Sequence, residues 1–287
     1  MNKCAWHNLF YSPNEPHLRA GWQLIIQLAM MFGIMGFLIL TFAFINTSFH
    51  WKLISTNLLI LSTLIQLISF TLSTYIAQRF LAHHPFLDLG LRSYEDFGID
   101  IFTGIVLPGF IFGIVYVAMK HLGWLYTVEQ TLQIDIGQVG LYCLIFIIVG
   151  FQEELLCRGY ILQTITNGSN VYWGMLGSSL IFAMMHLGNP GANWMALVGI
   201  FFAGMFLAFA AMRTGHLWLS IGLHIGWNFF EGLVWGFPAS GVAIYSPSPV
   251  HITGPVLWTG GAFGPEAGLI ILPALAIGAM LVWAYTR

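Results

Sequence analysis

The chain has 287 residues, of which 58% are hydrophobic and only 7% are charged, and its formal net charge is −2. Because soluble domains carry about 25% charged residues, this composition excludes a soluble globular domain and predicts a protein embedded in a lipid bilayer. The near-neutral charge gives no indication of a nucleic-acid partner. Three cysteines lack the spacing of a disulfide framework or a metal motif and are expected to be free thiols: Cys4, Cys143 and Cys157.

Apolar stretches long enough to cross a bilayer recur along the chain. A hydrocarbon core about 30 Å thick needs roughly 20 apolar residues in a helix. The fold expected is therefore all-α, a polytopic membrane helical bundle of about eight transmembrane helices. The predicted stretches are residues 22–45, 53–77, 101–119, 139–165, 173–187, 194–212, 217–235 and 267–285. The first is too long for a signal-peptide core and lacks a clean small-residue cleavage site, so it is expected to remain as a span.

The connections between these stretches suggest three regions. Residues 1–138 hold N-terminal transmembrane helices and polar loops, and residues 139–235 hold the central spans. Residues 236–287 hold the last transmembrane helix after a segment rich in Gly, Pro and Ser, which is expected to be an irregular loop.

Eight crossings place both termini on the same side of the membrane. With that side taken as the inside, most of the basic residues of the loops fall inside, and only Lys52 and Lys120 fall outside. Since cytoplasmic loops carry an excess of Lys and Arg, both termini are expected to be cytoplasmic. The inside set is Lys3, Arg19, Arg79, Arg92, Arg213 and Arg287.

Three ionisable residues interrupt the apolar run of the fourth stretch: Glu153, Glu154 and Arg158. Such groups are costly in hydrocarbon and are rare there unless they face a protein interior or a wet cavity. Glu154 and Arg158 are four residues apart, so they share one helix face and can form an ion pair. A purely structural ion pair that ties helices together is the alternative interpretation.

Further polar side chains lie on two later stretches. His186 lies on the fifth, while His224, Asn228 and Glu231 follow one stripe of the seventh at i, i+4 and i+7. Glu231 lies at the end of its stretch, near the interface, and is expected to be structural. Small residues that let helices approach closely accompany these side chains on the same two stretches. They are Gly174, Gly177, Ser178, Ser179, Gly222 and Gly226.

Two carboxylates, two imidazoles and an amide that meet in one pocket suit hydrolysis. A Glu can take a proton from water, and His or Asn can stabilise an oxyanion. Alternatively, Glu153, His186 and His224 would ligate a divalent metal such as zinc, with the other Glu as base. The residues alone leave both chemistries open.

The order Glu153-Glu154-x-x-x-Arg158-Gly159, Phe182-x-x-x-His186 and His224-x-x-x-Asn228 resembles the CPBP intramembrane protease family. That family includes type II CAAX prenyl endopeptidases and bacterial Abi proteins. The resemblance covers about residues 140–233 and implies a protease core in the central region. It implies a CAAX-type endopeptidase, glutamate-dependent and with or without a metal, that cleaves a membrane-associated peptide or protein in the cytoplasmic membrane of a prokaryote.

The resemblance also implies a role for each matching residue. Glu153 would activate water together with His186, and Glu154 would support it, held by Arg158. His224 and Asn228 would stabilise the oxyanion, or His224 would be a metal ligand.

Two other classes of function remain as alternatives. One is a non-catalytic immunity or regulatory membrane protein that uses the same pocket to bind a partner. The other is a transporter in which the buried carboxylates relay protons or ions. The absence of an internal sequence repeat weakens the transporter interpretation.

Overall fold

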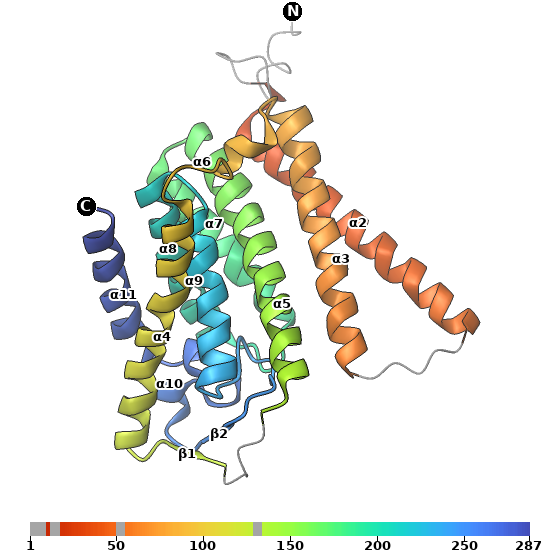
Figure 1. Ribbon diagram of the computed structural model, residues 1–287. Coiled ribbons are helices and arrows are strands. Elements are labelled where there is room, and N and C mark those ends of the chain that lie inside the picture. The colour runs from red at the N-terminus through yellow and green to blue at the C-terminus, as the bar shows by residue number, and fades with distance from the viewer. Residues whose placement is uncertain (1–9, 12–17, 50–54, 129–133) are drawn as a thin grey trace, which may run out of the picture.

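The structure is a computed structural model of the chain and describes residues 10–11, 18–49, 55–128 and 134–287. It is almost entirely helical, and long helices run alternately up and down between the two ends of the molecule (Figure 1). The helices that cross it, with the short turns that extend them, are α2 (Ala20–Phe49), α3 (Ser55–Ile76) with η1 (Ala77–Leu81), α4 (Phe97–His121), α5 (Ile136–Glu154) with η3 (Leu155–Ile161) and α6 (Leu162–Gly168), α7 (Val171–Met185) with η4 (His186–Gly188), α8 (Trp194–Thr214), α9 (Trp218–Asn228) with η5 (Phe229–Val234), and α11 (Ile271–Tyr285).

The all-α polytopic bundle is confirmed, whereas the count of eight spans is not. Six helices in the described part are long and apolar enough to cross a membrane. They correspond to the first six predicted stretches. The seventh and eighth stretches are helical too, but Trp218–Val234 and Ile271–Tyr285 are shorter. The last helix begins later than predicted because η7 (Pro265–Ala267) and Gly268 occupy the start of the predicted stretch.

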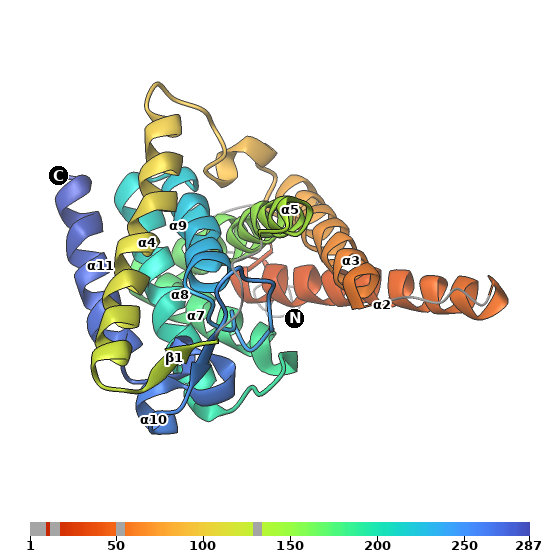
Figure 2. The same ribbon diagram turned by 60° about the horizontal axis from the view of Figure 1, so that its bottom comes forward.

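The molecule has a compact body and a projecting pair of helices. The body is formed by α4, α5, α7, α8, α9 and α11, while α2 and α3 lean outward from it (Figures 1 and 2). Helix α2 packs mainly on α3 and α6, and α3 packs on α5. One apolar core cluster includes residues of all three predicted regions, from Met31 to Val282. The proposed division into regions remains a prediction.

Helix α9 lies inside the body, and its closest neighbour is α4. Glycines make this approach possible, because a Cβ at Gly222 would lie 2.5 Å from the Ile101 carbonyl oxygen, and one at Gly226 would collide with Ile105 O. On the facing helix, a Cβ at Gly104 would lie 2.6 Å from Leu219 O. The expectation that small residues bring these helices together is confirmed for α9.

Asparagine and aspartate side chains fix where several body helices begin. Asp135 accepts a hydrogen bond from Gln138 N at the start of α5, and Asn170 and Asn193 cap α7 and α8 in the same way. Such caps satisfy backbone N–H groups that have no partner within the helix. Gly215 ends α8 in the left-handed conformation, with φ of 72°.

The segment after η5 is more ordered than the irregular loop predicted for residues 236–266. It contains β2 (Val250–Ile252), which pairs antiparallel with β1 (Leu125–Thr127) and places His251 opposite Tyr126. It then folds over the end of the body, where Phe237, Phe263 and Glu266 are buried. The remaining short elements are η2 (Phe86–Leu89), α10 (Val256–Thr259), η6 (Gly261–Phe263) and η7.

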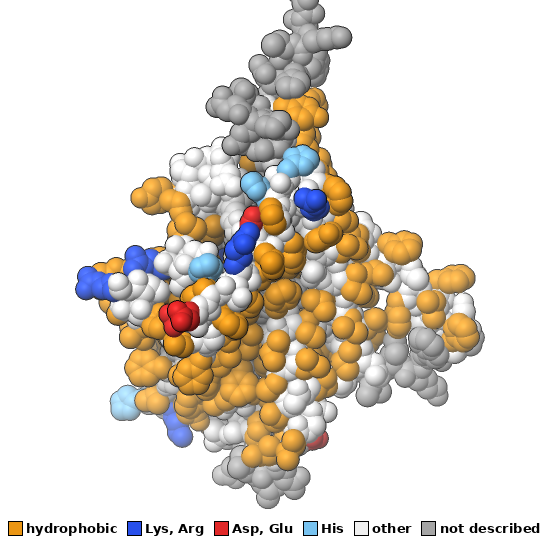
Figure 3. Space-filling view, turned by 45° about the horizontal axis from the view of Figure 1, so that its top comes forward, with side chains coloured by type: hydrophobic (Ala, Val, Ile, Leu, Met, Phe, Trp, Pro, Cys, Tyr) orange, Lys and Arg blue, Asp and Glu red, His pale blue; other side chains and the backbone are white. Residues whose placement is uncertain are grey.

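The surface fits a bilayer. Large hydrophobic side chains are exposed on α2, α3, α4, α5, α7, α8 and α11, while the buried set includes many polar ones. In Figure 3, charged side chains and histidines gather mainly at the end turned toward the viewer, and hydrophobic side chains cover the flank below. The protein is therefore an integral membrane protein, with polar ends and an apolar belt.

Candidate functional site

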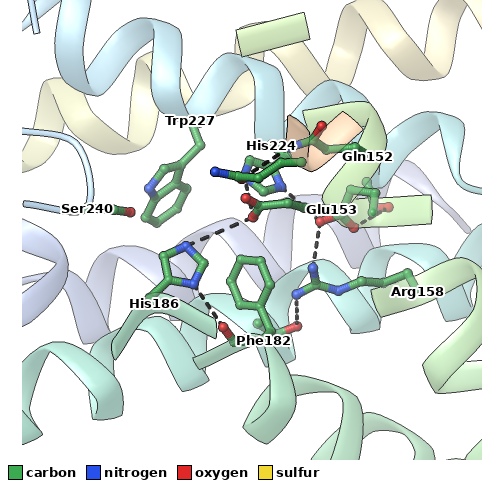
Figure 4. Close-up of polar contacts among 12 residues, drawn as sticks. Gln152, Glu153, Arg158, Phe182, His186, His224, Trp227 and Ser240 are labelled. Carbon is green, nitrogen blue, oxygen red and sulfur yellow. Dashed lines mark hydrogen bonds and ion pairs between the residues drawn. The ribbon is translucent and has the colours of Figure 1, made fainter. Parts of the chain in front are cut away.

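The structure brings the polar residues of three predicted stretches together inside the body. Glu153 and Glu154 end α5, and Arg158 follows within the π-helical η3. His186 follows the last residue of α7, and His224 and Asn228 lie on α9. Figure 4 shows His186 and His224 facing Glu153, with Arg158 beside the Phe182 ring. A π-helical turn often marks a functional site, and here such a turn begins directly after the two carboxylates.

Glu154 is the structural hub of this cluster. Its Oε1 lies 2.6 Å from Arg158 Nη1 and 2.9 Å from His224 Nδ1, and its Oε2 accepts a hydrogen bond of 2.8 Å from Ser220 Oγ. Both Glu154 and Arg158 are fully buried as side chains. Three groups, from Arg158, His224 and Ser220, therefore already contact the Glu154 oxygens.

Arg158 ties the hub to neighbouring helices. Its Nη2 donates a hydrogen bond of 3.0 Å to the carbonyl oxygen of Gly204 on α8. Its guanidinium carbon lies 4.3 Å from the centre of the Phe182 ring on α7, a cation–π contact. The predicted ion pair with Glu154 is thus present, and the same side chain links three helices.

Glu153 differs from its neighbour, because its Oε2 is buried and has no hydrogen-bond partner among the described residues. This atom lies 3.9 Å from His186 Nε2 and 3.8 Å from His224 Nε2. A water 2.8 Å from both ends of such a gap makes normal hydrogen bonds. Glu153 Oε2 therefore lies at a distance from each imidazole nitrogen that one bridging water can span.

The orientation of each imidazole is set by the bond on its other nitrogen. His186 Nδ1 lies 2.8 Å from the Phe182 carbonyl oxygen, which can only accept, so Nδ1 carries the hydrogen. His224 Nδ1 faces the Glu154 carboxylate in the same manner. Both Nε2 atoms are thereby directed toward Glu153.

A small cavity adjoins this cluster. It offers about 20 Å³ to the centres of water molecules, and a water needs roughly 10–15 Å³ by that measure. Glu153 is not part of its lining, which includes His186, His224 and Asn228. The other lining residues are Phe182, Trp227, Ser240 and Glu266, with Ile200, Ala203 and Leu207 of α8. The site is therefore large enough for water.

The residues predicted as metal ligands have the right chemistry for a divalent cation. Two imidazole nitrogens and one carboxylate form the donor set of many catalytic zinc sites. In the part of the chain that the structure describes, however, no three His, Cys, Asp or Glu side chains are grouped closely enough to hold an ion. The metal set Glu153, His186 and His224 remains a prediction.

Other outcomes concern residues around the site. Glu231, expected to be structural near the end of its stretch, lies in η5 and is completely buried, and neither of its carboxylate oxygens has a hydrogen-bond partner in the described structure. Its structural role remains a prediction. Cys143 and Cys157 are free thiols as predicted, and Cys4 lies outside the described residues.

Sequence reasoning missed several residues that complete the site. Ser220 lies four residues before His224, so extending the α9 stripe by one turn would have found it. The Gly204 carbonyl, Ser240 and Glu266 gave no such signal, because a backbone atom has no residue type and loop residues follow no period.

A comparison with protein families supports a function for this segment. The model of the type II CAAX prenyl endopeptidase Rce1-like family matches residues 135–230, which run from the cap of α5 to just past Asn228. No curated protein and no solved structure matches the chain. The family match confirms the resemblance drawn from the motifs. It supports CAAX-type intramembrane protease activity in general, with a peptide or protein substrate reached in the bilayer.

Proposed function

We propose that this protein is an intramembrane endopeptidase that hydrolyses a peptide bond of a membrane-associated protein or peptide, with Glu153 and His186 activating the attacking water. The observation that carries the proposal is the buried Oε2 of Glu153, which is flanked by two imidazole Nε2 atoms at 3.8 and 3.9 Å. A carboxylate oxygen and an imidazole lone pair are both bases, so together they hold a water and accept its proton.

In the proposed reaction, the water oxygen attacks the carbonyl carbon while Glu153 accepts one of its protons. The carbonyl oxygen gains negative charge, and the Asn228 amide and His224 Nε2–H donate hydrogen bonds to it. In this step the His224 ring carries a hydrogen on both nitrogens and is positively charged. The Glu154 carboxylate, which accepts a hydrogen bond from His224 Nδ1, stabilises that charge. The C–N bond then breaks and Glu153 returns the proton to the leaving amine, which gives a carboxylic acid and an amine.

Glu154 and Arg158 act in this proposal by holding the reacting groups in place. The Arg158 guanidinium compensates the Glu154 charge, and Glu154 orients His224. A small displacement of a reacting group lowers the rate of cleavage strongly. The buried, hydrogen-bonded Glu154 and Arg158 side chains prevent such a displacement in this proposal.

Glu153, His186 and His224 are the residues that would hold a divalent metal such as zinc. A bound ion would polarise the carbonyl group or lower the pKa of water. Metal analysis of the purified protein tests this part, with a variant in which all three residues are replaced. We expect the metal content to fall in the variant, and equal metal content in both proteins would contradict these ligands.

The reaction is tested with purified protein and a membrane-anchored peptide. We expect Glu153→Gln and His186→Ala each to abolish cleavage, since each removes a base beside the water site. Glu231→Gln is the matched control, because it makes the same isosteric change at a buried glutamate away from the cavity lining. If both site variants cleave as fast as the parent, the catalytic assignment is wrong and a non-catalytic binding role gains support.

We also propose that the protein lies in the cytoplasmic membrane of a prokaryote with both termini inside. Arg213 donates two hydrogen bonds to Thr286, and Trp218 donates one to the Arg92 carbonyl, which gathers several basic residues at the end where α11 finishes. Lys120 lies near the opposite end, at the end of α4. Reporter fusions at residue 287 test this: fluorescence of a cytoplasmic reporter supports it, and activity of a periplasmic phosphatase contradicts it.

A further inference from the structure

The lining of the cavity beside His186 and His224 includes residues from two distant parts of the chain that are hydrogen-bonded to each other. Glu266 is buried, and its Oε1 accepts a hydrogen bond of 2.7 Å from the Trp227 indole N–H. Its Oε2 accepts hydrogen bonds of 2.7 and 2.8 Å from the backbone N–H and the hydroxyl of Ser240. Charge-assisted bonds of this length are among the stronger ones in proteins. One carboxylate therefore fastens α9 to the segment that follows η5.

Ser240 is held from both sides of the site. Its carbonyl oxygen accepts a hydrogen bond of 2.9 Å from Asn189, which lies three residues after His186. Its φ of 47° is in the left-handed region, which is uncommon for a residue other than glycine. Such a conformation persists only where the surroundings impose it, and it occurs often beside functional sites. Here the bonds from Asn189 and to Glu266 impose it.

The fastened residues also border the reacting groups. Trp227, Ser240 and Glu266 line the same cavity as His186, His224 and Asn228. Trp227 and the proposed oxyanion donor Asn228 are both on α9 and both line this cavity. Ser240 and Glu266 lie beyond residue 230, where the family match ends.

We propose that Glu266 is a positioning residue of this site, which fixes Trp227 and Ser240 as the surface that receives the substrate segment beside the cleaved bond. This inference rests on the proposed protease function. The indole ring and the apolar side chains of α8 make this surface suited to an apolar substrate segment. Glu266 acts through the groups it holds and does not touch the reacting atoms.

Glu231 provides an internal control for this inference. It is a second buried glutamate, close enough to Glu266 for their charges to interact, but it does not line the cavity. Replacing either glutamate by glutamine removes one carboxylate at constant shape. Only the change at Glu266 replaces an oxygen that accepts a hydrogen bond from Trp227 or Ser240 by an NH2 group that cannot accept one.

The experiment compares the parent with Glu266→Gln, Trp227→Phe and Glu231→Gln in two measurements. In peptide cleavage, we expect Glu266→Gln and Trp227→Phe to raise KM about tenfold with a smaller change in kcat, because each removes hydrogen bonds that hold the substrate surface. In hydrogen exchange followed by mass spectrometry, we expect faster exchange of residues 237–242 in Glu266→Gln. Glu231→Gln should match the parent in both measurements.

Two results would overturn the inference. One is unchanged exchange of residues 237–242 in Glu266→Gln. The other is loss of thermal stability with KM unchanged, which shows a structural role only. The exchange measurement needs no substrate, so it separates this inference from the proposed function. If the parent cleaves no membrane peptide, the proposed protease function is contradicted. The exchange rates of residues 237–242 then still show whether Glu266 holds the cavity wall.

Discussion

Two pairs of glutamates are buried in the part of the chain that the structure describes, and they share one arrangement. In each pair one carboxylate is saturated by three donors, Glu154 at the end of α5 and Glu266 in η7. The other member, Glu153 or Glu231, has at least one oxygen without a hydrogen-bond partner in the described chain. The saturated members serve as anchors in both places.

The pairs differ in what surrounds the unpartnered oxygen. Glu153 Oε2 lies near two imidazole nitrogens beside a cavity of water size, whereas Glu231 is enclosed near the Glu266 carboxylate and the Trp227 indole. A buried carboxylate oxygen can act as a general base where a second base and space for a water molecule lie beside it. We therefore expect a chemical role for the first pair and a packing role for the second, although both are buried.

The largest effect is expected for Glu153→Gln, which tests the proposed difference between the two pairs. We expect cleavage of a membrane-anchored peptide to fall about 10²–10⁴-fold, since a general base is lost while the shape is kept. Initial rates of the purified variant measure the effect. The unfolding temperature should stay close to that of the parent, and a rate within tenfold of the parent would contradict the role of this oxygen.

Arg158→Met tests the anchor of the first pair. The variant leaves the Glu154 charge buried without its counter-ion, which we expect to destabilise the protein by about 3–5 kcal/mol. Unfolding in detergent measures the change. Adding Glu154→Gln should restore part of the stability, because the uncompensated charge is then removed. A double variant less stable to unfolding than Arg158→Met alone would refute this account.

Gly226→Ala disturbs both pairs at once. Its added Cβ meets the Ile105 carbonyl oxygen of α4, so α9 must shift, and α9 carries both His224 and Trp227. We expect a loss of about 1–3 kcal/mol in stability, typical of overpacking, together with slower cleavage. Gly33→Ala on α2 is the control, because nothing lies within 4 Å of a Cβ there. Equal behaviour of the two variants would show that α9 can move freely.

The smallest effect is expected for Glu231→Gln. Glutamine keeps the shape and removes the cost of burying an unpaired carboxyl group beside a second one, so stability should stay the same or rise by about 1 kcal/mol. Cleavage should change less than twofold relative to the parent. A large loss of activity would mean that the second pair takes part in the chemistry as well, and the contrast between the two pairs would fail.

Much of this arrangement was predictable because helices repeat. The apolar lengths predicted the spans, the i, i+4 spacing predicted the Glu154–Arg158 pair, and the stripe of His224 and Asn228 predicted one face of α9. The small residues Gly222 and Gly226 predicted close packing. Each of these follows from local geometry that the residue types set by themselves.

The remaining features depend on contacts between distant segments, which no spacing encodes. The order of residues does not reveal that Glu153 keeps a free oxygen while Glu154 is saturated, since that depends on where Ser220, Arg158 and His224 meet. Nor does it reveal that Glu231 is enclosed, or that Glu266 and Ser240 complete the cavity. The residue types and their spacing predict a membrane helical bundle with acids and bases on helical stripes. Which carboxylate is saturated by donors and which keeps an unpartnered oxygen depends on the tertiary structure, because packing brings the hydrogen-bond partners together.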